Sequence, residues 1–245
     1  MKNHSAFLPD RNLIRLMNIL LFASITITSF CQEAKTFKVK AGEDIRKVIP
    51  TREMCRYDQY QEGHLFFPSG KSSSLMRLNY NFLFDEMMFI DKKGDTLFVN
   101  NENVFLYAEI GKDIFHHDTS KGFFEILAGN DTIKLLRKQS FLFTQRDITG
   151  SNGYGDVSSS ASVVALRKVP GTTAGMTKNQ DVTYTKSVTF FFMDSEKKII
   201  KATKSSLMKL LPEKKTDLQG YLKNKKTDFD NENDLLSLMA FVNSK

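Results

Sequence analysis

The sequence predicts a mainly β protein of the α+β class, in which an antiparallel β-meander forms a curved sheet or half-barrel with short C-terminal helices packed on it. Three observations lead to this prediction. Short apolar runs separated by turn residues fill positions 63–143, one long alternating run covers 182–193, and after Thr203 the hydrophobic period changes from two residues to about 3.6. A length of 245 residues, 41% of them hydrophobic, suits one domain with an appendage. The pattern leaves open whether the sheet is open, a sandwich or a closed barrel.

The N-terminus has the features of a targeting segment. Its basic front consists of Lys2, Arg11 and Arg15. The apolar stretch that follows, Leu16–Ile27, is too short to cross a bilayer, which needs about 20 residues. We therefore expect a signal peptide at residues 1–31 and an exported protein of the periplasm, the outer envelope or the extracellular space.

The cysteine at the end of this segment allows two interpretations. Ser29 and Cys31 satisfy the small-x-small rule, which predicts cleavage after Cys31 and a mature chain that begins at Gln32. The alternative is a lipoprotein with an acylated Cys31, although the residues before it lack the usual leucine and the small residue next to the cysteine. If Cys31 is removed, Cys55 is alone and is expected to be buried rather than paired.

The meander is built from short strand-like runs bounded by turns rich in glycine, aspartate, serine and lysine. The runs are His64–Phe67, Leu75–Phe84, Met87–Ile90, Thr96–Val99, Val104–Ile110, Ile114–His117, Phe123–Leu127 and Thr132–Lys138. In the second run, alternation predicts one apolar face with Met76, Leu78 and Tyr80. The opposite face is predicted to be polar and carries Arg77, Asn79 and Asn81.

The run Val182–Met193 has the longest alternation in the chain. Its apolar face is expected to hold Val182, Tyr184, Val188, Phe190 and Phe192, and hydroxyl side chains occupy the other face. We predict a central or near-central strand in which Phe190 and Phe192 are buried. The turn at 195–198 then leads to a hairpin partner at Ile199–Ala202.

Three short amphipathic helices are predicted after Thr203. Their stripes are Leu207, Leu210 and Leu211; Leu218, Tyr221 and Leu222; and Leu235, Leu238, Met239 and Val242. Pro212 separates the first two helices, and Asn231 is the expected N-cap of the third. Helices this short need tertiary burial, so we expect them to dock on the sheet, with a small separate bundle as the alternative. The predicted organisation is a β domain at 32–203 and a helical C-terminal segment at 204–245.

Positive charge is concentrated near the C-terminus. Without residues 1–31 the chain keeps 32 basic and 27 acidic side chains, a net charge of +5, and residues 195–226 alone hold ten lysines against three acids. Such a region can attract an anionic envelope component or polymer, whereas lysines on short helices are often simply a solvated face. The weak binding candidates here are Lys209, Lys214 and Lys215.

A glycine- and serine-rich stretch at 149–162 is a second, weaker binding candidate through Gly153, Tyr154 and Gly155. It resembles a phosphate-binding loop only in its glycines, because such loops follow a strand, open a helix and keep a strict spacing. A long surface loop is the simpler interpretation.

Imidazole and carboxylate groups near position 116 are the best metal candidates. His116, His117 and Asp118 lie close to Asp113, and His64 is a possible distant partner. Adjacent residues on a strand point to opposite faces, which argues against joint ligation by the two histidines. We expect no metal and no cofactor.

Carboxylates around two predicted turns could in principle serve glycoside chemistry. They are Asp85, Glu86, Asp91 and Asp95. Acidic residues at hairpin turns are, however, what solubility and turn geometry alone would place there. We therefore expect no catalytic residue.

Several motifs resemble a group of uncharacterised secreted proteins of Bacteroidota. They are Leu78-Asn79-Tyr80-Asn81, Asp85-Glu86-Met87-Met88-Phe89-Ile90-Asp91 and Gly94-Asp95-Thr96-Leu97, together with the Leu-Met-Lys-Leu-Leu-Pro stretch and the acidic stretch near the C-terminus. The resemblance covers most of residues 45–243. It implies export and a β-rich fold with a helical tail, and it carries no activity.

The sequence therefore favours an exported or envelope-associated, non-enzymatic β-rich binding or scaffold protein. The first alternative is a carrier or anchor for a lipid or another apolar ligand in a cavity under the C-terminal helices, and the second is a secreted hydrolase. The partners to consider are an anionic envelope component or polymer and an apolar small molecule, with no specific nucleic acid.

Overall fold

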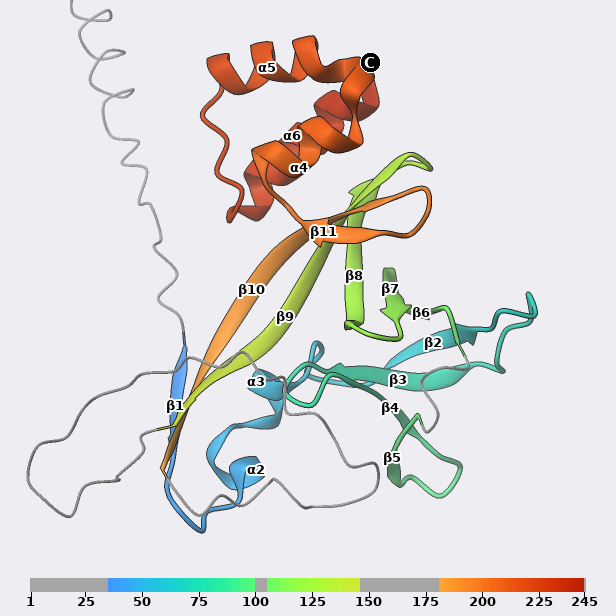
Figure 1. The fold of residues 1–245 in the computed structure, drawn as a ribbon. Coiled ribbons are helices and arrows are strands. Elements are labelled where there is room, and N and C mark those ends of the chain that lie inside the picture. Colours follow the sequence, from blue (N-terminus) through green and yellow to red (C-terminus); the bar gives the residue numbers. More distant parts are fainter. Residues whose placement is uncertain (1–34, 100–104, 146–180, 245) are drawn as a thin grey trace, which may run out of the picture. The chain divides into compact units, whose positions relative to one another are not determined.

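The predicted strands pair into one antiparallel sheet. The computed structural model describes residues 35–99, 105–145 and 181–244 (Figure 1), so the expected signal peptide and the 149–162 loop, with Gly153, Tyr154 and Gly155, lie outside the described residues. The strands are β1 (Thr36–Val39), β2 (Gln61–Phe66), β3 (Met76–Asn81), β4 (Glu86–Ile90), β5 (Thr96–Phe98), β6 (Tyr107–Ile110), β7 (Asp113–Asp118), β8 (Gly122–Gly129), β9 (Ile133–Gln145), β10 (Val182–Asp194) and β11 (Ile199–Lys201).

The order of the strands confirms the predicted β-meander and shows that the sheet is open. Within the described residues the order is β1-β10-β9-β8-β7-β6-β2-β3-β4-β5, and β11 pairs with β10. Strands β6 to β9 follow one another as a meander, whereas β2 inserts between β3 and β6. All neighbouring strands are antiparallel. The two ends of the path, β1 and β5, do not meet, so the described sheet is not a closed barrel.

The long strand β10 pairs with β9 along its whole length and enters more than one hydrophobic core (Figure 1). Its first half contributes Val182 and Tyr184 to the main core, which is formed with β3, β4, β6 and β7. Its second half contributes Phe190 and Phe192, which are 3% and 0% exposed, to a core shared with the C-terminal helices. The predicted burial of these two phenylalanines is therefore confirmed.

The prediction that Val188 belongs to the buried face is wrong. Its side chain is 44% exposed. In the β9–β10 register it lies opposite Gln139, between the part of β10 that serves the main core and the part that serves the helices. Alternation fixes which side Val188 points to, but neither core extends far enough along the strand to cover it.

The second predicted strand is shorter than the pattern suggested. β3 ends at Asn81, and Phe82–Asp85 forms a turn that leads directly to β4. The amide oxygen of Asn81 accepts hydrogen bonds from the backbone of Leu83 (3.0 Å) and Phe84 (3.2 Å). Asn79 and Asn81, on the face predicted to be polar, are both buried. Their side chains bind backbone groups of Tyr57 and of this turn, respectively.

Two short helices after β1 are not evident from the periodicity. α2 (Ile45–Val48) is capped by Asp44, whose carboxylate accepts from the Arg46 backbone N–H at 3.0 Å, and α3 (Thr51–Met54) follows Pro50. They lead to Cys55, which is buried and unpaired as predicted. Burial raises the pKa of its thiol to about 11, which makes the reactive thiolate rare.

The three predicted C-terminal helices are confirmed. α4 (Lys204–Leu210) starts with a capping box between Thr203 and Ser206, a 3₁₀ turn η2 (Pro212–Lys214) links it to α5 (Lys215–Asn224), and α6 (Glu232–Ser244) ends the described chain. Asn231 accepts from the Asp234 backbone N–H at 3.2 Å, as expected for an N-cap. We call these elements together the helical cap.

The helical cap packs on one end of β8, β9 and β10 through a shared apolar core. Leu207, Leu218 and Leu238 from the cap are 0% exposed and join Leu135 and Phe192 of the sheet. This arrangement agrees with docking on the sheet rather than with a separate bundle. Within the described ranges, no helix has the length and apolar character that crossing a membrane requires.

The first test concerns the core under the helical cap. Phe190→Ala should lower the free energy of unfolding by about 3–5 kcal/mol, because the ring is enclosed and its removal leaves a cavity. Urea unfolding measures the change, and Val188→Ala, at the exposed position on the same face, is the matched control. Equal stability of the two variants would contradict the assignment of the core.

Candidate functional site

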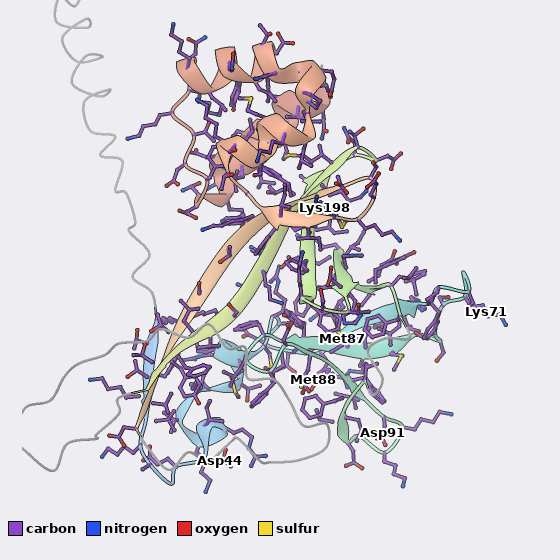
Figure 2. All side chains as sticks on the ribbon, in the orientation of Figure 1. Asp44, Lys71, Met87, Met88, Asp91 and Lys198 are labelled. Atoms are coloured by element: carbon purple, nitrogen blue, oxygen red, sulfur yellow. The ribbon has the colours of Figure 1, made fainter. Side chains whose placement is uncertain are left out.

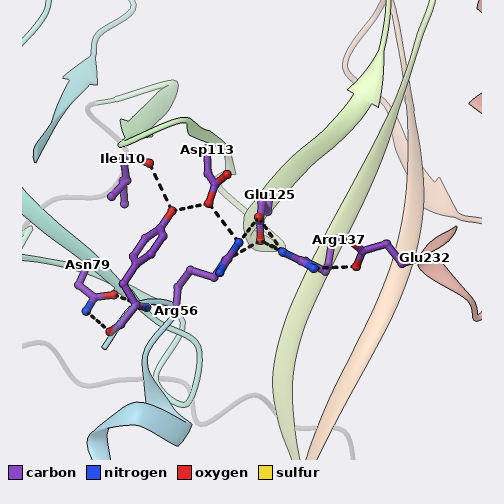
Figure 3. A network of polar contacts seen from close by, with 8 residues as sticks. Arg56, Asn79, Ile110, Asp113, Glu125, Arg137 and Glu232 are labelled. Atoms are coloured by element: carbon purple, nitrogen blue, oxygen red, sulfur yellow. Dashed lines mark hydrogen bonds and ion pairs between the residues drawn. The ribbon is translucent and has the colours of Figure 1, made fainter. Parts of the chain in front are cut away.

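A row of charged side chains crosses the sheet between the main core and the helical cap (Figure 3). At its centre is Glu125 of β8, which is 5% exposed. Its carboxylate accepts hydrogen bonds from Arg56 Nη2 at 2.9 Å and Nε at 3.1 Å, and from Arg137 Nη2 at 2.7 Å. Two guanidinium groups thus bind the same buried carboxylate from two sides.

Each arginine also reaches a second acid. Arg56 Nη2 donates to Asp113 at 3.1 Å, and Arg137 Nη1 donates to Glu232 at 2.7 Å. Asp113 in turn accepts from the hydroxyl of Tyr57 at 2.8 Å. We call these six residues the charge network. It connects the loop after α3, the strands β7 to β9, and the first turn of α6 (Figure 3).

The strand register explains why these charges meet. Glu125 lies directly opposite Arg137 in the β8–β9 pair, and side chains at opposite positions stand on the same face about 4.5–5.5 Å apart. Arg56 is held by its own backbone, whose N–H donates to the Tyr80 carbonyl oxygen at 2.8 Å. Tyr57 is fixed by Asn79, whose amide exchanges two hydrogen bonds with its backbone, at 3.2 and 2.9 Å.

Burial and pairing act in opposite directions on the pKa of Arg56, but in the same direction on the pKa of Tyr57. Burial lowers the pKa of Arg56, whereas its hydrogen bonds to Glu125 raise it, and the net pKa is raised. The pKa of the Tyr57 hydroxyl is also raised. Burial is the larger cause, and the hydrogen bond to Asp113 is the next. Arg56 and Tyr57 therefore keep their protons near neutral pH. The arrangement of the network suits positioning of the segments that it joins.

A second polar cluster surrounds Asp85, one of the carboxylates considered for glycoside chemistry. Its carboxylate accepts from the Tyr80 hydroxyl at 2.6 Å, from the Phe123 backbone N–H at 3.2 Å and from Lys138 Nζ at 2.8 Å. Asp85 has a left-handed backbone with φ of 55°, and Gly122 must be glycine because a Cβ there would overlap this carboxylate. Asp85 thus ties the β3–β4 turn to β8 and β9.

The other acids considered for catalysis are placed separately. Asp91 accepts from the backbone N–H groups of Lys93 at 2.8 Å and Asp95 at 2.9 Å, so it stabilises the β4–β5 turn. Glu86 is buried on β4 at 1% exposure, directly opposite Asn81. Asp91 and Asp95 are thus parts of the turn, in which the Asp91 carboxylate binds backbone N–H groups.

The metal candidates do not converge. His117 is buried and packs against the rings of Phe105 and Phe123, with centroids at 5.3 and 4.6 Å, and His116 points to the opposite face of β7. Asp118 accepts from the backbone N–H groups of Ser120 at 2.9 Å and Lys121 at 2.8 Å and so stabilises the next turn. Among the described residues, no group of three or more histidine, cysteine or acidic side chains could hold a metal ion.

The lysine candidates have different surroundings. Lys209 and Lys215 are exposed. Lys214 is half-buried, and its Nζ donates to the Val242 carbonyl oxygen at 2.8 Å near the end of α6. Lys214 therefore belongs to the packing of the helical cap, in contrast to the solvent-facing position that the sequence suggested.

Sequence reasoning singled out Asp113 but missed the other members of the charge network. The available signal was a charged residue inside an apolar run, as with Glu125 in the predicted strand 123–127 and Arg137 in 132–138. Their pairing depends on the strand register, which periodicity does not supply. Comparisons with family models, with curated proteins and with solved structures gave no match to this chain.

The charge network generates a prediction about stability. Glu125→Gln should lower the free energy of unfolding by about 3–5 kcal/mol, because it leaves two largely buried guanidinium groups without their shared carboxylate. Urea unfolding is the measurement. Glu62→Gln, at an exposed position on β2, should stay within about 0.5 kcal/mol of the wild type. If Glu125→Gln lowered the free energy of unfolding no more than Glu62→Gln does, the network would contribute nothing to stability.

The two adjacent histidines generate a pH prediction. Burial lowers the pKa of both His116 and His117 in the folded protein. In the unfolded chain these histidines keep the ordinary pKa of about 6.5, so near that pH the unfolded chain binds more protons than the folded one. Stability should therefore fall as the pH drops from 7 through about 6.5 towards the folded-state pKa values. Urea unfolding between pH 7 and 5 should show a smaller fall in the variant His116→Gln/His117→Gln. An unchanged pH dependence in that variant would contradict this origin.

Proposed function

We propose that this protein is exported and acts without catalysis as a β-rich binding or scaffold protein of the cell envelope or the extracellular space. The open sheet is the frame, the charge network and the shared core hold the helical cap on it, and the exposed faces are available to partners. Export is proposed from the features of residues 1–31, which lie outside the described residues.

The packing beneath the helical cap is the observation that carries the proposal. A carrier needs a pocket of about 300–1,000 Å³ that encloses most of its ligand. Where such a pocket would lie, the apolar side chains of the cap and of β9 and β10 fill the space, and Leu211, Leu235 and Met239 are at most 1% exposed. Filled packing supports a frame over the alternative of an apolar carrier.

The partners of the buried charged side chains give further support to the proposed scaffold function. A hydrolase needs titratable side chains that face substrate with perturbed pKa values and free coordination sites. Here Glu125 is bound to Arg56 and Arg137, and Asp113 is bound to Arg56 and Tyr57. Asp85 is bound to Tyr80, Lys138 and the backbone of Phe123. These groups stabilise the contacts between segments, which is the work of a scaffold.

Native mass spectrometry of the protein recovered from its producing cells tests the proposal. The expected mass is that of a chain beginning near Gln32, with no added mass from a bound small apolar molecule. A fluorescent fatty acid added to the same preparation should show no stoichiometric, saturable binding, because the space under the cap is filled.

Two results would overturn the proposal. A copurifying lipid, or stoichiometric binding of the fatty acid that Leu218→Trp abolishes, would favour the carrier. A chain that keeps residues 1–31, or a mass that includes a diacylated Cys31, would contradict a freely exported protein and indicate a membrane anchor.

A further inference from the structure

The segment 195–226 carries exposed lysines on β11, α4, α5 and the turns beside them. Of its ten lysines only Lys214 is half-buried, and the ion pairs found in the described ranges involve none of the others. We call the other nine the lysine face: Lys197, Lys198, Lys201, Lys204, Lys209, Lys215, Lys223, Lys225 and Lys226. Figure 2 labels Lys198 beside β11, next to the helical cap.

The fold fixes the direction in which these lysines point. Leu207 of α4 and Leu218 of α5 are buried in the shared core. At about 100° per residue, Lys209 lies about 200° round α4 from Leu207, and Lys223 lies about 140° round α5 from Leu218. Both lysines therefore project from the side of their helix that faces away from the shared core.

The helical cap that presents these charges is anchored at several points. Arg137 binds Glu232, Asn130 Nδ2 donates to Asn243 Oδ1 at 2.8 Å, and Lys214 binds the Val242 carbonyl oxygen. Of the acids that follow the segment, Glu232 is thus already paired, and Asp234 accepts from the Asp228 backbone N–H at 2.8 Å. Binding at the lysine face consequently needs little ordering of the backbone.

The chemistry of the lysine face indicates the class of its partner. It contains lysine and no arginine, so it offers strongly hydrated point charges without the planar fork that recognises phosphate in two-point contacts. Tyr221, the one aromatic residue of 195–226, is stacked on Phe241 at 4.5 Å and does not offer a platform for a nucleic-acid base. The leucine stripes are buried in the shared core and leave little apolar surface to enter a bilayer.

We propose that the lysine face is a docking surface for an anionic polysaccharide, a long hydrophilic chain with repeated carboxylates. This inference rests on the proposed function, because it names the class of partner that the scaffold binds. The attraction is the sum of many screened charge contacts, so it depends on salt and needs no pocket.

The test uses the mature protein and immobilised polygalacturonate, with neutral dextran as the blank. The test variant replaces Lys209, Lys215, Lys223 and Lys226 by Gln. The matched control, with the same loss of charge at exposed positions elsewhere, replaces Lys38, Lys47, Lys92 and Lys112 by Gln. Lys214 stays intact in both because it binds α6.

We expect the test variant to bind polygalacturonate about tenfold more weakly than the wild type at low salt, and with a shallower dependence on salt, while the control stays within about twofold. Urea unfolding should give equal stability for both variants, since all the replaced side chains are exposed. Replacing the same four face lysines by Arg is a second variant, which keeps the charge and should restore binding.

Three outcomes would overturn the inference: no binding by the wild type, equal weakening of the test and control variants, or failure of the Arg variant to bind. Tighter binding to single-stranded DNA or to anionic phospholipid vesicles, at equal concentration of negative charge, would assign the face to another class of partner. The proposed function fails by a bound apolar ligand, by retention of residues 1–31 or by a diacylated Cys31, so the two failures can be distinguished.

Discussion

The pairing of β9 with β10 is the interaction on which the rest of the structure depends. Thirteen residue pairs join Ile133–Gln145 to Val182–Asp194 without a break. One end carries Tyr184 into the main core, the other carries Phe192 into the core under the helical cap, and Met193 enters a third, smaller cluster on the opposite face. Because side chains alternate between faces, a slip of one residue would misplace all three sets at once. The register of this single pair of strands is therefore strongly specified.

The charge network lies where that pair of strands passes from one core to the other. Apolar packing alone could fix the main core and the helical cap separately, but hydrophobic contacts are non-directional and do not select one arrangement. Buried charges are satisfied only in one geometry, because a guanidinium that loses its carboxylate pays the full cost of desolvation. Arg137 binds Glu125 of the sheet and Glu232 of α6 together, so it supplies the directional contact at this junction.

The sequence contained most of the fold and little of the site, for a physical reason. Hydrophobic period is a local property, and it located the strands around 87–90, 114–117 and 182–193 and all three C-terminal helices. It could not show that Asn79 and Asn81 are buried, because their burial depends on hydrogen bonds to Tyr57 and to the turn after β3. The charge network likewise joins residues 56, 125, 137 and 232, which only tertiary structure brings together.

Arginine and lysine have different roles in this molecule, and the difference bears on its function. The arginines of the charge network are inside, where a rigid fork with several donors can satisfy a buried carboxylate. The segment 181–244 has no arginine, and its exposed lysines take no part in the ion pairs found among the described residues. Lysines already bound to acids would have to break those pairs before they could meet an anion. The buried arginines hold the lysine face in place, and its lysines are exposed and outside the ion pairs of the described residues. The lysine face therefore combines a fixed position with accessible positive charge, which electrostatic binding requires.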